Sequence, residues 1–369
     1  MVVLLVGGAG YIGSHVSRLL RARGYEVLVY DNLSTGYAFL AGGSELVVGD
    51  IADGVALGKV LKGVDAVMHF AAHAYVGESV QNPRKYFHNN VEAALVLLNA
   101  VVDAGAKYLV FSSSCAVYGV PASIPITEDT PRQPINPYGA SKLFFENALE
   151  AYDRAYGLRY VSLRYFNAAG ADESGTIGEI HVPETHVIPL ALAAAAGFVP
   201  EFRIYGNNYP TPDGTCIRDY VHVSDLAEAH VLALEHLLHG RSSLQLNLGT
   251  GHGYSIRQVL DAIKEVTDND VPVRISPRRP GDPAELVADP SRAQAVLGWK
   301  ATRSLHDIVA TAWNWMQQQL AAEGTGTFAL AHNQGLSAGQ CVHAEDGVCS
   351  HQVVLRGRVR AFASDGQAG

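Results

Sequence analysis

Residues 2–14, VVLLVGGAGYIGS, decide the fold of this chain, because an apolar run of strand length leads directly into glycines and then into a helical pattern. Gly7, Gly10 and Gly13 follow one another at intervals of three residues. Between a strand and a helix, such glycines make the tight turn, let the backbone approach a pyrophosphate and let helix and strand pack closely. The helix that follows presents free N–H groups and a positive dipole end to the phosphates. The stretch therefore predicts a dinucleotide-binding turn.

Apolar runs and helical patterns continue to alternate through the first half of the chain, which predicts an α/β fold of the Rossmann type. Strands of a parallel sheet are buried on both faces, and right-handed crossovers through helices produce a doubly wound arrangement. We expect strands at Val2–Val6, Glu26–Tyr30, Leu46–Val48, Ala66–Phe70, Tyr108–Ser112 and Tyr160–Arg164. We expect helices at Tyr11–Arg23, Pro83–Ala104 and Tyr138–Tyr156.

The alternation loosens in the second half, and the chain divides into three parts. Residues 1–167 are expected to form the NAD-binding Rossmann domain, and residues 168–321 a smaller C-terminal α/β substrate lobe, with room for the chain to cross back. Residues 322–369 are rich in Gly, Ala, Ser and His, which predicts a weakly structured C-terminal extension. The helical patterns of the second half lie at Val187–Ala196, Val223–His239, Ile256–Thr267 and Leu305–Leu320.

The C-terminal extension contains residue types that bind metals, namely Cys341, His343, Cys349 and His351. Two Cys-x-His pairs are not a familiar zinc-ligand spacing. The extension is therefore better interpreted as a loose tail, and the sequence predicts no metal site.

Composition excludes several classes of protein. The 369 residues carry a formal net charge of −9, which argues against nucleic acid or an anionic membrane as a partner. The longest apolar stretches, Ala93–Val102 and Leu190–Gly197, are too short to span a bilayer. Four cysteines in so long a chain argue against a disulfide scaffold. We therefore expect no nucleic-acid or membrane partner and a cytoplasmic location.

Asp31 supplies the second half of the dinucleotide signal. It lies 18 residues after Gly13, at the end of the second expected strand. A carboxylate at this place can bind the adenosine ribose hydroxyls and would repel a 2′-phosphate. The cofactor is therefore expected to be NAD and not NADP. Asp50 and Ile51 follow the third strand and are expected beside the adenine.

A second group of residues predicts acid–base chemistry. Ser112, Ser113 and Ser114 end the fifth strand, at the sheet edge that faces the ligand crevice. Tyr138 follows Ser114 by 24 residues, and Lys142 lies one helical turn further on the same face. A lysine ammonium near the phenol, together with the positive nicotinamide, favours the phenolate, which can accept a proton from a hydroxyl that the serine aligns. The order of these residues after the dinucleotide motif predicts a dehydrogenase-type site.

With these motifs in place, the sequence over about residues 2–318 resembles the extended short-chain dehydrogenase/reductase family and, within it, the nucleotide-sugar 4-epimerases. The matching segments are Gly7-Gly8-Ala9-Gly10-Tyr11-Ile12-Gly13-Ser14-His15, Asp31-Asn32-Leu33-Ser34, His69-Phe70-Ala71-Ala72, Val76-Gly77-Glu78-Ser79, Ser112-Ser113-Ser114, Tyr138-x-x-x-Lys142, Arg164-Tyr165-Phe166-Asn167, Arg218-Asp219-Tyr220-Val221-His222-Val223 and Arg279-Pro280-Gly281-Asp282.

The resemblance implies a role for each matching position. Ser114, Tyr138 and Lys142 would be catalytic. The cofactor NAD would be bound by Gly7, Gly10, Tyr11, Ile12, Gly13, Asp31, Asn32, Leu33, Ser34, Thr35, Gly36, Asp50, Ile51, Phe70, Ala71, Ala72, Asn90, Ser112, Tyr138, Lys142, Tyr165 and Phe166. The substrate would be bound by Ser114, Tyr138, Asn167, His186, Val187, Tyr205, Arg218, Arg279, Asp282 and Leu286. Arginines suit a pyrophosphate, because the guanidinium fork pairs with two phosphate oxygens.

The activity that the resemblance implies is epimerisation at C4 of a UDP-hexose, UDP-glucose or UDP-galactose, through a transient 4-keto intermediate. A homodimer joined through Pro83–Ala104 and Tyr138–Tyr156 is also implied. Two residues depart from the family pattern: Ala74 stands where some members have a cofactor-contacting lysine, and His186 stands where many have an asparagine.

Three alternatives remain open at this point. The substrate can be another UDP-sugar, such as UDP-N-acetylglucosamine, UDP-glucuronate or UDP-xylose. The enzyme can be another nucleotide-sugar dehydratase or reductase, although a 4,6-dehydratase would need an Asp-Glu pair after Ser114, where Cys115-Ala116 stands. The chain can be an NAD-binding regulator without catalysis, against which Ser114, Tyr138 and Lys142 all argue.

Overall fold

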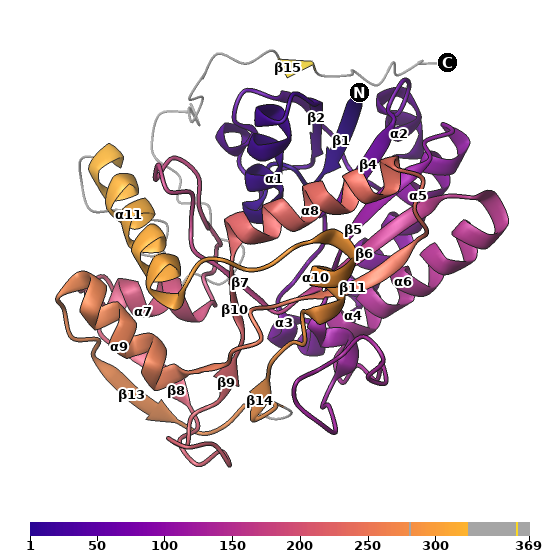
Figure 1. Cartoon of the computed structure of the whole chain (residues 1–369). Coiled ribbons are helices and arrows are strands. Elements are labelled where there is room, and N and C mark those ends of the chain that lie inside the picture. Colours follow the sequence, from indigo (N-terminus) through magenta and orange to yellow (C-terminus); the bar gives the residue numbers. More distant parts are fainter. Residues whose placement is uncertain (280–281, 324–358, 361–369) are drawn as a thin grey trace.

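We analysed a computed structural model of the chain, which describes residues 1–279, 282–323 and 359–360 (Figure 1). The cysteines and histidines of the C-terminal extension lie outside the described residues. No helix of the described part is long and apolar enough to cross a membrane.

The centre of the fold is a parallel sheet with the strand order β11-β6-β5-β4-β1-β2-β3-β15. The order reverses direction at β1, as a doubly wound sheet requires, so the predicted Rossmann-type fold is confirmed. The eighth strand is a two-residue pairing from the C-terminal extension onto β3. The strands are β1 (Val2–Val6), β2 (Glu26–Asp31), β3 (Glu45–Val48), β4 (Ala66–His69), β5 (Tyr108–Ser114), β6 (Arg159–Tyr165), β11 (Leu244–Leu248) and β15 (Val359–Arg360).

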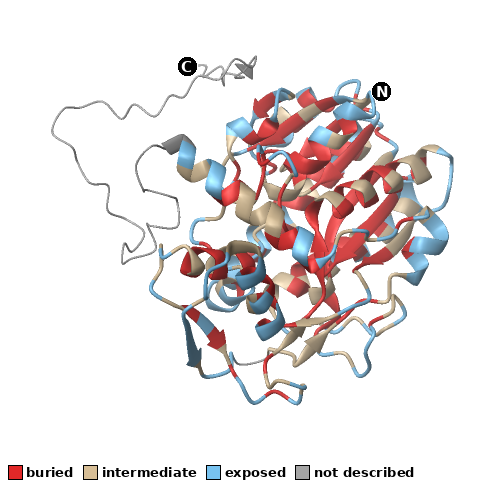
Figure 2. Ribbon diagram, turned by 60° about the vertical axis from the view of Figure 1, so that its left-hand side comes forward, coloured by how far each residue is buried: buried red, intermediate tan, exposed pale blue. Residues whose placement is uncertain are grey.

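Helices cover both faces of this sheet, and its strands are buried between them (Figure 2). One face packs on α1 (Tyr11–Ala22) and α8 (Val223–Leu238), which contribute Val16, Leu20 and Leu234 to the core. The other face packs on α2 (Gly54–Val60), α5 (Ala94–Asp103) and α6 (Pro137–Tyr156). Burial on both faces is why the strands read as continuous apolar runs.

The smaller lobe has its own apolar core and lies at the carboxyl edge of the sheet (Figure 1). Its helices are α7 (Val187–Ala195), α9 (Ile256–Thr267) and α11 (Leu305–Glu323). Its short strands are β7 (Asn167–Ala169), β8 (Phe202–Tyr205), β9 (Ile217–Arg218), β10 (Tyr220–His222), β12 (Tyr254–Ser255), β13 (Val273–Ser276) and β14 (Glu285–Leu286). Between these segments the chain crosses back to the Rossmann part, because β11 is a strand of the large sheet and α8 packs on that sheet.

The expected helix Pro83–Ala104 is not one regular α-helix. It consists of α4 (Pro83–Phe87), a π-helical turn at His88–Ala93 and α5. The π-helical turn brings the Asn90 amide to the main chain of His73, to which it donates and from which it accepts. Wider turns of this kind are frequent at functional sites, since they re-aim a side chain without ending the helix.

Candidate active site

The glycine turn after β1 leaves no room for side chains. Gly7 has φ +81°, and a Cβ there would lie 2.5 Å from the Ala71 nitrogen. A Cβ at Gly13 would lie 2.5 Å from the Gly7 oxygen, which would force α1 away from the turn. Gly10 caps α1 without a side-chain hydrogen bond, so the first N–H groups of the helix remain available to an anion. These features fit the pyrophosphate of a dinucleotide.

Asp31 ends β2 beside this turn. Its buried carboxylate accepts hydrogen bonds from the backbone N–H groups of Ala9, at 2.9 Å, and Leu33, at 2.8 Å. Burial raises the pKa of Asp31, and the two backbone hydrogen bonds oppose that effect. Each oxygen keeps a second lone pair, so the carboxylate can still accept from a ribose. The Asn32 amide donates to Asp50 at 2.9 Å and ties the ends of β2 and β3 together.

The chain that follows β4 lies against the glycine turn, with Phe70 and Ala71 next to Gly7. The backbone N–H groups of Phe70 and Ala71 both donate to the Val6 oxygen. The loop that follows is held by Asn90, whose amide also donates to the Ser141 hydroxyl at 3.1 Å. Asn90 was expected to contact the cofactor directly. In the structure its amide contacts the His73 main chain and Ser141 of α6, and the cofactor contact stays a prediction.

The three residues expected to be catalytic lie together at the end of β5 and the start of α6. The Ser114 side chain lies close enough to the Tyr138 phenol to lower its pKa. The Lys142 ammonium donates to the Ser112 carbonyl at 2.7 Å and lies 5.8 Å from the centre of the Tyr138 ring. The Ser112 hydroxyl bonds the Tyr165 hydroxyl. Serine, phenol and lysine therefore share one end of the sheet.

Burial shifts the pKa of both Tyr138 and Lys142 in the protein alone. Burial raises the pKa of Tyr138 to about 12, against a smaller lowering by the Ser114 side chain. Burial also lowers the pKa of Lys142 to about 7, partly offset by Glu146. In the protein alone, desolvation penalises the charged forms of both groups. The expectation that Lys142 and the positive nicotinamide together favour the phenolate stays a prediction. The phenolate thus needs a further positive charge.

A buried ion pair behind the site was not predicted from the sequence. Glu146 accepts from Arg164 at 2.7 and 2.8 Å and from the Ser113 hydroxyl at 2.6 Å. Arg164 also donates to the Tyr118 hydroxyl, which donates to Asn247. The network links β5, β6, β11 and α6 below the catalytic residues. The available signal was a carboxylate one helical turn after Lys142, on the face that turns toward the sheet.

The smaller lobe, at the carboxyl edge of the sheet, carries several of the residues that are expected to bind substrate. Arg218 on β9 forms an ion pair with Asp282 at 2.5 Å, and the Arg279 guanidinium lies 4.0 Å from the centre of the Tyr205 ring. Leu286 on β14 pairs with Arg218 across the strands. The structure thus brings together five of the ten residues expected to bind substrate, namely Tyr205, Arg218, Arg279, Asp282 and Leu286. Asn167 begins β7 where the large sheet ends, and its N–H donates to the Asp219 carbonyl.

His186 belongs to a group that the sequence analysis did not recognise. Its Nδ1 lies 2.8 Å from carboxylate oxygens of both Glu179 and Glu184, and His181 lies 3.1 Å from Glu179. Burial disfavours the imidazolium, but the carboxylates outweigh it and raise the pKa of His186 to about 10 and of His181 to about 9. The signal was the spacing Glu-x-His-x-x-Glu-x-His at residues 179–186.

The glycine turn, Asp31 and the Ser114–Tyr138–Lys142 group together define a class, the dinucleotide-dependent enzymes of the Rossmann type. The profile of the NAD dependent epimerase/dehydratase family matches residues 3–249. The chain belongs to this family, which confirms the resemblance found in the sequence.

Individual relatives agree with this assignment. A UDP-glucose 4-epimerase of Lactobacillus helveticus is 50% identical over 319 residues, which are 85% of this chain and 97% of the relative. The crystal structure of UDP-glucose 4-epimerase from Brucella ovis in complex with NAD has 52% identity and a TM-score of 0.83, over 85% of this chain and 97% of that one. The crystal structure of the UDP-glucose 4-epimerase from Bifidobacterium longum in complex with NAD⁺ and UDP has 39% identity and a TM-score of 0.83, over 87% of this chain and 99% of that one.

Proposed function

We propose that this chain is an NAD-dependent UDP-hexose 4-epimerase that interconverts UDP-glucose and UDP-galactose. The observation that carries the proposal is the joint placement of Ser114, Tyr138 and Lys142 at the sheet edge that also holds the glycine turn. The proposal is supported by the relatives, which are named UDP-glucose 4-epimerases and which this chain matches over nearly their whole length.

The chemistry follows from the residues of the crevice. NAD, when bound on the glycine turn, supplies a hydride acceptor and a positive ring charge that favours the Tyr138 phenolate. Tyr138 then takes the proton of the sugar O4 while Ser114 hydrogen-bonds that oxygen and aligns it. Loss of this proton and of a hydride from C4 leaves a 4-keto sugar. After the sugar presents its other face, the hydride returns to C4 and Tyr138 returns the proton to O4, so that no net oxidation results.

The smaller lobe has to hold the UDP part while the sugar turns. Arg218 and Arg279 offer guanidinium groups to the diphosphate. The Tyr205 ring offers a flat apolar face to the uracil. Because these contacts lie away from the sugar, they allow its ring to rotate between the two half-reactions.

Purified protein given UDP-glucose or UDP-galactose, without added NAD, tests the proposal. Both reactions should reach the same mixture of the two sugars, with no net release of NADH. Steady NADH release during turnover would show a dehydrogenase instead.

We propose NAD over NADP because Asp31 is positioned to accept from a ribose hydroxyl and would repel a 2′-phosphate. Protein stripped of its cofactor should regain activity with NAD. Equal recovery with NADP would contradict the assignment.

We also propose a homodimer in the cytoplasm. Large apolar side chains are exposed on the helices expected at the interface: Phe87 is 43% exposed on α4, and Phe144 is 47% exposed on α6. Light scattering at micromolar concentration should give twice the mass of one chain, and Phe144→Glu should reduce it to one chain. A wild-type monomer would contradict the dimer. The division into a Rossmann domain, a substrate lobe and a C-terminal extension remains our working description of the chain.

A further inference from the structure

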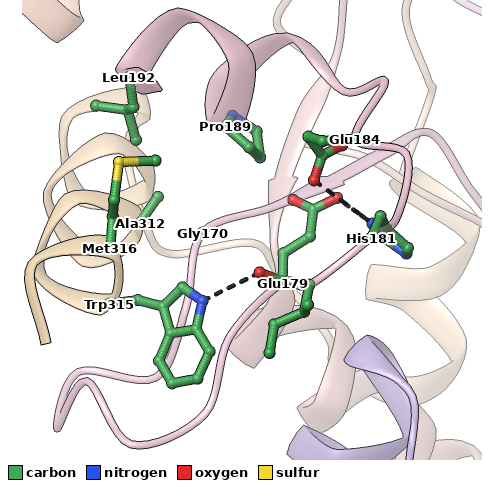
Figure 3. A pocket seen from close by; sticks show the side chains of 10 residues that line it. Gly170, Glu179, His181, Glu184, Pro189, Leu192, Ala312, Trp315 and Met316 are labelled. Carbon is green, nitrogen blue, oxygen red and sulfur yellow. Dashed lines mark hydrogen bonds and ion pairs between the residues drawn. The ribbon is translucent and has the colours of Figure 1, made fainter. Parts of the chain in front are cut away.

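The segment before α7 gathers four metal-binding side chains beside the active-site crevice. These are Glu179, His181, Glu184 and His186, and one ligand atom from each lies within 4.8 Å of all the others. Figure 3 shows the carboxylates of Glu179 and Glu184 directed toward each other, with His181 on the same side. None of the four takes part in the proton transfer proposed above. We refer to them as the His/Glu quartet.

The spacing within the quartet is close to that of a tetrahedral metal site. His186 Nδ1 lies 2.8 Å from Glu179 Oε1 and from Glu184 Oε1. His181 Nδ1 lies 3.1 Å from Glu179 Oε1 and 3.8 Å from Glu184 Oε2. Zinc bonds to nitrogen and oxygen of about 2.0–2.2 Å place tetrahedral ligands roughly 3.3–3.6 Å apart. The four atoms lie up to 4.8 Å apart, so the widest separation would have to close by about 1.2–1.5 Å to reach that distance.

The quartet also has coordinating capacity that the protein itself does not use. The side chains of Glu179 and Glu184 are only 6% and 3% exposed. Within the described ranges 1–279 and 282–323, no hydrogen bond reaches Glu179 Oε2, and Glu184 Oε2 is met only by the longer ion pair with His181 at 3.8 Å. A cavity of about 30 Å³ adjoins both carboxylates and His181, which is roughly room for one water molecule or ion.

The surroundings hold the quartet in place. The Trp315 indole N–H on α11 donates to the Glu179 carbonyl at 3.0 Å (Figure 3). Glu184 Oε1 accepts from the backbone N–H groups of Thr185 and His186. The rings of Tyr11 and Tyr75 pack edge-on against His181. Such contacts orient ligands before a metal binds, as outer-shell groups do in metal sites.

We propose that the His/Glu quartet is a binding site for one divalent transition-metal ion, with Zn²⁺ as the best match. Two imidazoles and two carboxylates form a ligand set that zinc accepts, whereas Mg²⁺ and Ca²⁺ prefer oxygen ligands alone. The protein itself would supply all four ligands of the ion, as it does in structural zinc sites. The ion would fix the segment before α7 between α11 and Tyr11, the first residue of the cofactor helix.

Zinc titration of the metal-stripped, full-length protein in the presence of NAD tests this site. Calorimetry should show one more Zn²⁺ per chain bound to the wild type than to His181→Gln or Glu184→Gln. His88→Gln is the matched control, because His88 forms an exposed pair with Glu92 at 2.8 Å that lacks a third ligand. The control should bind as many ions as the wild type. The cysteines and histidines of the C-terminal extension are present in every protein compared and cancel in the difference.

Cobalt provides a readout that does not depend on the variants. Co²⁺ in the quartet should show the visible spectrum of a tetrahedral nitrogen and oxygen site, without sulfur-to-cobalt charge transfer. Equal zinc stoichiometry in the wild type and in both quartet variants would overturn the proposal. So would a wild-type protein that binds no cobalt or binds it only through sulfur. In that case the quartet is a set of ion pairs between two imidazolium groups and two carboxylates.

Discussion

The end of the large sheet and the smaller lobe form two walls of the site, and they have opposite effects on the ionisable side chains that they carry. On the wall formed by the large sheet, Tyr138 and Lys142 lie where burial raises the pKa of the phenol to about 12 and lowers that of the amine to about 7. Both groups are thereby pushed toward their neutral forms. On the wall formed by the smaller lobe, Arg218 is paired with Asp282, and His186 is paired with two glutamates. These groups are kept charged.

The difference matches two tasks. A group that must accept and return a proton works best when neither protonation state is strongly favoured in the complex. A group that must bind a diphosphate works best when it stays charged and pre-oriented. The neutral wall lacks one positive charge, which the cofactor supplies, and the charged wall needs none. The following substitutions test this contrast, beginning with the largest expected effect.

Tyr138→Phe removes the proton acceptor from the neutral wall and leaves its shape nearly unchanged. We expect turnover of UDP-galactose to fall by about 10²–10⁴-fold, the usual cost of losing a general base. Bound NAD and the unfolding midpoint should remain as in the wild type. Turnover within a few-fold of the wild type would remove Tyr138 from the mechanism.

Glu146→Gln tests the ion pair that supports the neutral wall. The side chains of Glu146 and Arg164 are 0% and 2% exposed, so Arg164 would remain as a buried charge without its partner. Breaking such a pair costs about 3–5 kcal/mol of stability, measurable by urea unfolding. Glu150→Gln is the control. Glu150 lies on the same helix as Glu146 and forms an ion pair with Arg132, but its side chain is 33% exposed. Its loss should therefore lower the free energy of unfolding by less than about 1 kcal/mol. Equal effects would show that burial of the pair is not decisive.

Lys142→Met tests the lowered pKa directly. In cofactor-free protein the folded state holds Lys142 neutral above about pH 7, whereas the unfolded chain keeps it charged up to about its ordinary pKa of 10.5. The unfolded state then binds more protons, so stability should rise with pH between these values. The wild type should therefore gain stability relative to the variant from pH 7 to 10, with a constant difference below pH 7. A constant difference throughout would mean that Lys142 is not desolvated.

The neutral wall could largely be predicted from the sequence, and the charged wall could not. Long apolar runs and the spacings around Gly7 and Tyr138 determine the sheet and the elements that carry the catalytic residues. The small lobe contains strands of two residues, such as β9 and β14, which are too short to show a periodic pattern. Burial raises the pKa of Tyr138 and lowers that of Lys142, and neither shift can be read from the spacing of the two residues. The pairing of His186 with Glu179 and Glu184 could not be predicted either, because it depends on the conformation of the loop that precedes α7.

Arg218→Lys weakens the charged wall without removing its charge. A lysine at this position cannot replace the guanidinium fork, so one charge-assisted hydrogen bond worth about 1.5–3 kcal/mol should be lost. We expect KM for UDP-galactose to rise by roughly 10–100-fold while kcat changes little. Arg278→Lys is the control, because Arg278 stacks on Tyr209 at 4.1 Å and donates to Asn208 instead. A fall in kcat without a change in KM would place Arg218 in the chemical step.

The smallest effect concerns sugar size, at the point where the two walls meet. Leu286 lies on β14 beside Arg218 and is half-buried against Val117, Phe166 and their neighbours. A leucine leaves more room than a tyrosine, so the wild type should accept UDP-N-acetylglucosamine as a slower second substrate. Leu286→Tyr should then exclude the N-acetyl group through overpacking of about 1–3 kcal/mol, which lowers kcat/KM for that sugar by roughly 5–150-fold. The kcat/KM for UDP-glucose should stay within about threefold, since glucose carries only a hydroxyl at C2.

Leu286→Met serves as the control for this last comparison, because it changes the shape of the side chain but hardly its volume. It should leave the ratio of the two kcat/KM values nearly unchanged. If Leu286→Tyr also leaves the ratio unchanged, the side chain at this position is directed into the cluster around Phe166 and not toward the sugar. If the wild type already prefers UDP-glucose by more than about a thousandfold, or roughly 4 kcal/mol, another residue closes the pocket. Either result would show that Leu286 does not set the size of the sugar that the site accepts.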